Sequence, residues 1–186
     1  MRASFALVGL VLAACGGDDP PPTPDAAPTE PPELAGITQL HNDVRAMVAT
    51  TDPLPPLAWS PKLAATAAAW VATCRDQLAP AGLLDHNQER SMGHAYYVGE
   101  NIFGASGPPT SSTPRDAVMA WAAEGASYDH ATNTCSGPTC GHYTQLVWRA
   151  TTEIGCAVGD CASLTFRRTL VCNYGPGGNV GNERPY

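Results

Sequence analysis

The spacing of apolar residues predicts helices in the first half of the chain. Between residues 34 and 48 they recur every three or four positions, as on one face of an amphipathic helix. These residues are Leu34, Ile37, Leu40, Val44, Met47 and Val48. Ser60 followed by Pro61 predicts a second helix start, because serine caps helices and proline suits the first turn. Its inner face would contain Leu63, Ala67, Trp70, Val71 and Cys74.

A third helix is predicted after Thr113-Pro114, which repeats the cap-then-proline signal. Its apolar residues include Val118, Met119 and Trp121, and Glu124 lies near its end. The stretch 79–104 between the second and third helices is interpreted as mostly loop, with two histidines and the tripeptide "GEN".

The period of the hydrophobic pattern changes from 3.6 residues to 2 residues in the last quarter of the chain. Alternating or β-branched runs predict strands, at residues 142–148, 153–159, 163–166 and 169–174. Helices first and an antiparallel sheet afterwards are typical of an α+β domain with helices packed on the sheet.

The N-terminal residues are interpreted as a targeting segment. Residues 1–14 combine one arginine with an apolar run too short to span a bilayer, which is typical of a signal peptide. "LAAC", ending at Cys15, resembles a bacterial lipobox, in which the cysteine is lipidated; an ordinary signal peptide cut near Ala14 is the alternative. Residues 15–33 are rich in proline and acidic residues and predict an extended tether. The folded domain is predicted over 34–186.

Composition excludes some partners and compartments. A formal net charge of -7 argues against nucleic-acid binding, which needs a basic surface. Of seven cysteines, six remain once Cys15 is set aside. An even number behind an export signal predicts disulfides, and the spacing alone leaves every pairing open.

Three common motifs of enzyme active sites are absent from the sequence. It contains no GxSxG elbow, HExxH helix or phosphate-binding loop. The histidines are His41, His86, His94, His130 and His142. Spacing alone assigns none of them a role.

Several longer motifs resemble the CAP superfamily of cysteine-rich secretory, antigen 5 and pathogenesis-related proteins. They are "HNDVR" (41–45), "GENIF" (99–103), residues 117–135, "GHYTQLVWRAT" (141–151) and "LVCNYGPGGNVGNERPY" (170–186). The resemblance runs from about Leu34 to Tyr186. It implies a three-layer α-β-α sandwich with a mainly antiparallel central sheet.

The resemblance also implies a cleft with two histidines and two glutamates. Glu100, Glu124 and His142 match the family motifs directly. The second histidine is expected to be His86, in "LLDHNQE", with His94 as the alternative. Two imidazoles can bind zinc or another divalent cation weakly, with the carboxylates orienting the rings. A purely structural hydrogen-bonded network is the competing interpretation.

Other residues receive structural interpretations. His41 and His130 are expected to be structural or solvent-facing, and Asn42 and Arg45 to stabilise the fold. Resemblance to the plant members, whose six cysteines fall in the same order, implies the pairs Cys74–Cys161, Cys135–Cys140 and Cys156–Cys172.

The expected function is a non-catalytic binding module, exported and tethered to a bacterial envelope by lipid, or secreted. Its partner would be a lipid or sterol-like ligand, or a partner in the envelope or host. A metal-assisted hydrolase or protease, with Glu100 or Glu124 as general base, is the alternative. A structural envelope domain is a third. Binding is preferred because the sequence shows no nucleophile supported by a base.

Overall fold

A four-stranded mixed sheet forms the middle of the molecule. The computed structural model describes residues 29–107 and 112–186. The strand order is β1-β5-β6-β2, and the strands are β1 (Ala58–Trp59), β2 (Gly99–Ala105), β5 (Glu153–Asp160) and β6 (Arg168–Gly175). β1 pairs with β5 in parallel, whereas β6 is antiparallel to both β5 and β2. The predicted α+β class with a mainly antiparallel sheet is confirmed.

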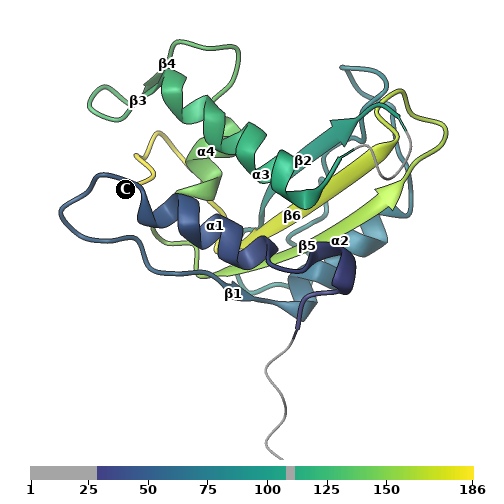
Figure 1. The fold of residues 1–186 in the computed structure, drawn as a ribbon, viewed down its shortest axis with the longest axis horizontal. Coiled ribbons are helices and arrows are strands. Elements are labelled where there is room, and N and C mark those ends of the chain that lie inside the picture. The colour runs from purple at the N-terminus through teal and green to yellow at the C-terminus, as the bar shows by residue number, and fades with distance from the viewer. Residues whose placement is uncertain (1–28, 108–111) are drawn as a thin grey trace, which may run out of the picture.

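Helices cover both faces of this sheet (Figure 1). The helices α1 (Ile37–Ala46), α3 (Pro114–Ala123) and α4 (Gly141–Leu146) lie on one face, and α2 (Pro61–Val71) lies on the other. Short 3-10 helices, η1 (Pro32–Leu34) and η2 (Glu124–Ser127), precede α1 and follow α3. A separate ribbon contains β3 (Tyr128–Asp129) and β4 (Thr134–Cys135). The layers are therefore helix, sheet and helix, as expected.

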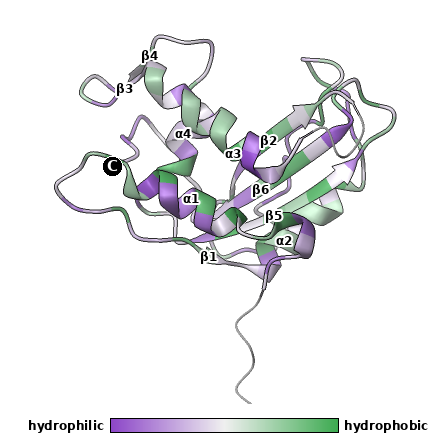
Figure 2. Ribbon diagram, viewed as in Figure 1, coloured by the Kyte–Doolittle hydropathy of each residue, from purple (hydrophilic) through white to green (hydrophobic). Residues whose placement is uncertain are grey.

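Alternation along the strands builds two hydrophobic cores. In β6, Leu170, Cys172 and Tyr174 pack with α1 and α3, while Val171 faces the core that contains Ala67 of α2. Figure 2 shows hydrophobic residues on α2 and on β5, the strand against which α2 packs. Because successive strand residues point to opposite faces, one buried strand contributes side chains to both cores.

The prediction that 79–104 is mostly loop was wrong at its C-terminal end. Residues 99–105 form β2, which pairs with β6 along all seven residues. β2 is an edge strand that is hydrogen-bonded to one neighbouring strand, β6. Its sequence contains two glycines, Gly99 and Gly104, which weaken the local strand signal. The short strand β1 was also missed, because it lies in a proline-rich connection.

The predicted strand at 142–148 is largely the helix α4. The carboxylate of Glu124 accepts hydrogen bonds from the backbone N–H groups of His142 (3.0 Å) and Tyr143 (3.1 Å). These N–H groups belong to the first turn, which has no internal acceptor for them. A distant carboxylate thus caps the helix and overrides the strand preference of these residues.

The predicted strand at 163–166 is a turn between β5 and β6. Leu164 N donates to Cys161 O (2.9 Å), and Phe166 N donates to Gly82 O (2.8 Å) in the loop after α2. A turn bond and a contact with another loop therefore replace a sheet ladder in this segment.

Three disulfides link the described residues. They are Cys74–Cys161, Cys135–Cys140 and Cys156–Cys172, the pairs that the resemblance implied. The last joins register partners in β5 and β6. Disulfides of this kind persist in oxidising compartments.

The predicted signal peptide, the lipidation site Cys15 and most of the tether lie outside the described residues. The last part of the predicted tether contacts the domain, because Glu30 accepts hydrogen bonds from Gly36 N (2.5 Å) and Thr38 N (2.7 Å) at the start of α1. No helix in residues 29–107 and 112–186 is long and apolar enough to cross a bilayer.

Candidate functional site

His142 is held by Glu124 in the first turn of α4. His142 Nδ1 lies 2.6 Å from Glu124 Oε1, while Glu124 Oε2 accepts the two backbone N–H groups that cap α4. The imidazole of His142 stacks beside Trp121, with ring centroids 6.1 Å apart and planes 18° apart. The carboxylate therefore fixes the backbone and the ring of the same residue.

His86 is held by Glu100 in the same manner. His86 Nδ1 lies 2.7 Å from Glu100 Oε1, which also accepts Asn87 N (2.9 Å). In the amide orientation that matches donors with acceptors, Asn173 donates to Glu100 Oε2 at 3.3 Å. The Glu100 side chain is fully buried, whereas that of His86 is 50% exposed.

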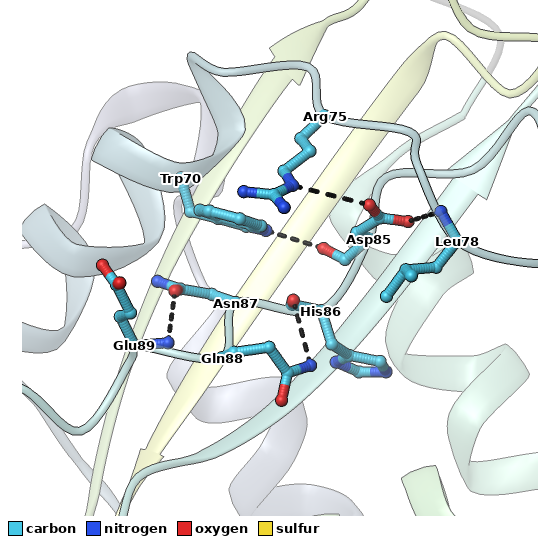
Figure 3. A pocket seen from close by; sticks show the side chains of 8 residues that line it. All are labelled: Trp70, Arg75, Leu78, Asp85, His86, Asn87, Gln88 and Glu89. Carbon is cyan, nitrogen blue, oxygen red and sulfur yellow. Dashed lines mark hydrogen bonds and ion pairs between the residues drawn. The ribbon is translucent and has the colours of Figure 1, made fainter.

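The backbone on either side of His86 is also fixed. Asp85 O accepts the indole N–H of Trp70 (2.6 Å), and the Asp85 carboxylate accepts Gln77 N and Leu78 N. Figure 3 shows the bonds of Asp85 to Trp70 and Leu78, with the imidazole of His86 pointing away from the indole of Trp70. These hydrogen bonds therefore fix the position of His86, although its loop is neither helix nor strand.

The two pairs approach the edge strand β2 from opposite faces of the sheet. Glu100 is the register partner of Asn173, on the face covered by α2, whereas Glu124 and His142 belong to the opposite helical layer. A hollow of about 280 Å³ is lined by both histidines and by Ile102 of β2. We call this hollow, with the two His–Glu pairs, the cleft.

One end of the cleft is apolar. A second hollow of about 260 Å³ shares Ile102 and His142 with the first. Its apolar lining includes Leu83, Phe103, Trp121 and Phe166. Phe166 is 39% exposed, so part of this surface is open to solvent.

His94, the alternative to His86, does not reach Glu100. Its Nε2 lies 3.1 Å from Thr66 Oγ1, and its ring packs near Tyr96. Burial and the nearby Lys62 lower the pKa of His94. The structure therefore groups His86, and not His94, with Glu100.

His41 and His130 have structural contacts, as expected. His41 is buried; its Nδ1 bonds Ile37 O (2.8 Å) and its Nε2 bonds the Tyr174 hydroxyl (2.9 Å). Burial lowers the pKa of His41 to about 4, so the ring is neutral at pH 7. The ring of His130 stacks on that of Tyr186, with centroids 4.3 Å apart.

Asn42 and Arg45 stabilise the fold, as expected. Asn42 exchanges hydrogen bonds with the backbone of Leu57. Arg45 donates only to backbone carbonyl oxygens, those of Pro55, Leu146, Trp148 and Thr151. Burial lowers the pKa of Arg45 to about 10, so it remains charged at neutral pH.

Asparagines behind the cleft were not predicted as site residues. Asn101 Nδ2 donates to His142 O (3.0 Å) and to the Tyr174 hydroxyl (3.2 Å), connecting the cleft to the buried His41. Asn173 supports Glu100 from the neighbouring strand. The alternation of "GENIF" could have revealed Asn101, because it points to the face opposite Glu100.

The hydrogen bonds of the two cleft histidines leave Nε2 as the ring atom available to a metal ion. In each ring Nδ1 donates to a carboxylate, which selects the tautomer with an unprotonated Nε2. A buried carboxylate behind an imidazole is the usual outer support of a metal ligand. No three His, Cys, Asp or Glu side chains within the described ranges are grouped closely enough to hold a metal ion. The protein would therefore supply two imidazoles, and other ligands would complete the sphere.

Comparison with known proteins identifies the class. The family model described as "CAP: Cysteine-rich secretory protein family" matches residues 38–174. The chain belongs to this family, which confirms the resemblance seen in its motifs. The family of secretory proteins and the three disulfides agree with an exported protein.

Individual relatives come from animals and plants. GLIPR1-like protein 1 of Homo sapiens is 36% identical over 193 residues, covering 97% of this chain and 71% of the relative. Pathogenesis-related protein PRMS of Zea mays is 41% identical over 148 residues, covering 78% of each chain. These relatives lend no support to the interpretation of the chain as a bacterial lipoprotein.

Solved structures share the fold. Venom allergen-like protein 4 of Schistosoma mansoni has a TM-score of 0.58 at 28% identity, covering 81% of this chain and 91% of the other. NaASP2, whose crystal structure was determined with Zn2+, has a TM-score of 0.59 at 23% identity, covering 88% of each chain. The second likeness shows the fold alone.

Proposed function

We propose that this chain is an exported binding module whose cleft holds a divalent cation through His86 and His142. The observation that carries the proposal is the pairing of each Nδ1 with a glutamate, at 2.7 and 2.6 Å. This pairing directs both Nε2 lone pairs away from their carboxylates. Two neutral imidazoles provide borderline-soft ligands of the kind that zinc prefers.

The cation would be held weakly and exchangeably. Structural zinc sites use four protein ligands, and catalytic sites commonly use three. Two histidines leave positions for water or for a donor atom of the bound ligand. A cation of this kind can connect the protein to its ligand.

A binding function is favoured over hydrolysis because both carboxylates already accept several hydrogen bonds from the protein. Glu100 accepts bonds from His86, Asn87 and Asn173, and Glu124 accepts three from His142 and Tyr143. A general base needs a lone pair directed at the proton that it removes. Both glutamates are instead engaged in orienting imidazoles and backbone.

The apolar end of the cleft supports a lipid- or sterol-like ligand. Leu83, Phe103 and Phe166 line a hollow that shares His142 with the proposed cation site. Ligand pockets are commonly apolar with a few directed polar groups. Membrane tethering through Cys15 is a further part of the proposal, supported by the "LAAC" sequence alone.

Zinc titration of the metal-free protein by isothermal calorimetry tests the proposal. We expect weak binding of one zinc ion, and at least a tenfold loss of affinity in His86→Ala and in His142→Ala. Glu124→Gln keeps an acceptor for the ring but removes the charge, so affinity should fall about tenfold.

His94→Ala is the matched control, because this histidine lies in the same loop region but outside the cleft. It should bind zinc as the unmodified protein does. Equal binding by His142→Ala and the unmodified protein would show that zinc does not use the cleft.

A further inference from the structure

A polar pocket adjoins the cleft on the other side of His86. Its volume is about 300 Å³, and its polar lining includes His86, Gln88, Arg90, Tyr97 and Asn179. It lies between the loop after α2, the start of β2 and the glycine-rich segment after β6. We call it the Arg90 pocket. The polar pocket shares His86 with the cleft, whereas the apolar hollow shares His142 with it.

The guanidinium of Arg90 is held in one orientation. Nε donates to Val98 O (2.7 Å), one terminal nitrogen donates to Asn87 O (2.8 Å) and the other to the Tyr97 hydroxyl (2.6 Å). The guanidinium carbon lies 5.3 Å from the centre of the Tyr97 ring. A long side chain fixed by three bonds loses little further freedom when a ligand binds.

Arg90 retains donors that the protein does not use. A guanidinium has five N–H donors, and the described residues accept three from Arg90, so two remain. Arg45 is the contrasting case, because its five bonds to carbonyl oxygens use every donor. Arg45 is therefore a structural cation, whereas Arg90 is satisfied only in part.

Arg90 also has no counter-charge in the described part of the chain. Arg75, Arg149 and Arg167 each have an aspartate oxygen within 4.0 Å, but no carboxylate lies that close to Arg90. Other described arginines, such as Arg45 and Arg115, also have no carboxylate within 4.0 Å, but Arg90 combines this with unused donors and a pocket. An oriented guanidinium with free donors is well suited to an oxyanion.

The surroundings favour a single negative charge. Glu100 also lines the pocket, and its carboxylate would repel a dianion more strongly than a monoanion. The Tyr97 hydroxyl accepts a bond from Arg90, which leaves its own hydrogen for a ligand. We propose that the Arg90 pocket binds the carboxylate group of the ligand that occupies the cleft, with Arg90 and Tyr97 as its donors.

This inference rests on the proposed function in one respect: the ligand whose carboxylate binds Arg90 would also contact the cation at His86. The carboxylate site itself does not require the cation. The two parts can therefore be tested separately on one sample, first metal-free and then with zinc.

The test is a titration of the ¹⁵N-labelled, metal-free full-length protein with sodium acetate and, separately, with sodium phosphate. We expect the Arg90 Nε–H signal to shift saturably with acetate and to show weaker binding of phosphate. Arg90→Gln should weaken acetate binding at least tenfold. Tyr97→Phe, which keeps the ring and the bonds of Arg90 to carbonyl oxygens, should weaken it about fivefold.

Arg115→Gln is the matched control, because Arg115 is an exposed cation on α3 far from this pocket in the sequence. It should leave acetate binding unchanged. A lack of saturation, or acetate binding by both Arg90→Gln and Tyr97→Phe that equals that of the unmodified protein, would overturn the proposal. Tighter binding of phosphate than of acetate would overturn the carboxylate class. If the protein binds acetate but not zinc, the carboxylate site is supported and only the proposed cation site is contradicted.

Discussion

Replacing Arg45 with methionine is expected to lower the free energy of unfolding by about 3–5 kcal/mol. The guanidinium donates to Pro55 O, Leu146 O, Trp148 O and Thr151 O, and only 2% of the residue is exposed. Methionine fills much of the space but donates nothing, so each carbonyl oxygen loses the guanidinium as a donor; Trp148 O keeps a bond from Thr151 N (3.2 Å). An unsatisfied buried polar group costs roughly 1–3 kcal/mol.

The measurement is urea denaturation of the oxidised protein, followed by tryptophan fluorescence. Arg115→Met is the control, because Arg115 is exposed and should change stability by less than about 0.5 kcal/mol. A loss below about 1 kcal/mol in Arg45→Met would mean that water satisfies these carbonyl groups. Arg45 joins α1 to the end of α4, so the Arg45→Met substitution should also weaken the support of His142.

Replacing Gly155 with alanine is expected to cost about 3 kcal/mol or more. A Cβ atom at this position in β5 would lie 2.1 Å from Ala64 N, 2.5 Å from Ser60 O and 2.7 Å from the Leu63 carbonyl carbon. All three are backbone atoms of the N-cap and first turn of α2, which cannot move aside as a side chain could. The helix would have to separate from the sheet along its most closely packed contact.

Gly141→Ala is the matched control for this change. A Cβ atom at Gly141 would lie 3.8 Å from Thr139 Oγ1 and 3.9 Å from Asn179 Nδ2, which is ordinary van der Waals contact. Thermal unfolding of both variants should show a large decrease in midpoint for Gly155→Ala and little change for Gly141→Ala. Comparable midpoints in the two variants would contradict the close packing of α2 on β5.

The helices that local signals define were predicted well. The capping box of Thr113 and Asp116 begins α3, and proline occupies the first turn of both α2 and α3. The buried residues of α2 are Leu63, Ala67 and Val71, all on its predicted inner face. Local capping and periodicity determine such elements, so the sequence alone is sufficient.

Elements that depend on distant partners were missed or misassigned. α4 is helical because Glu124, which lies eighteen residues before His142, caps its first turn. β2 forms because β6, far along the chain, supplies its ladder. Met47 was placed on an inner face, but it lies beyond the end of α1 and is 72% exposed.

The candidate site was predicted through family resemblance more than through residue spacing. Motifs located Glu100, Glu124 and His142, but the choice between His86 and His94 required the fold. The Asp85 contacts with Trp70, Gln77 and Leu78 place His86 beside Glu100. Arg90 was not predicted as a site residue, because no motif marks a cation whose role depends on unused donors.

Histidine tautomers measured by long-range ¹H–¹⁵N NMR test the central claim most directly. In the neutral form of both rings we expect the proton on Nδ1 and a free lone pair on Nε2, because the Nδ1 atoms of His86 and His142 face glutamate oxygens. Adding zinc should shift the Nε2 signals of these two rings and leave those of His41 unchanged. Neutral rings that carry their proton on Nε2, or the absence of a zinc-dependent shift, would contradict the assignment of the cleft as a cation site.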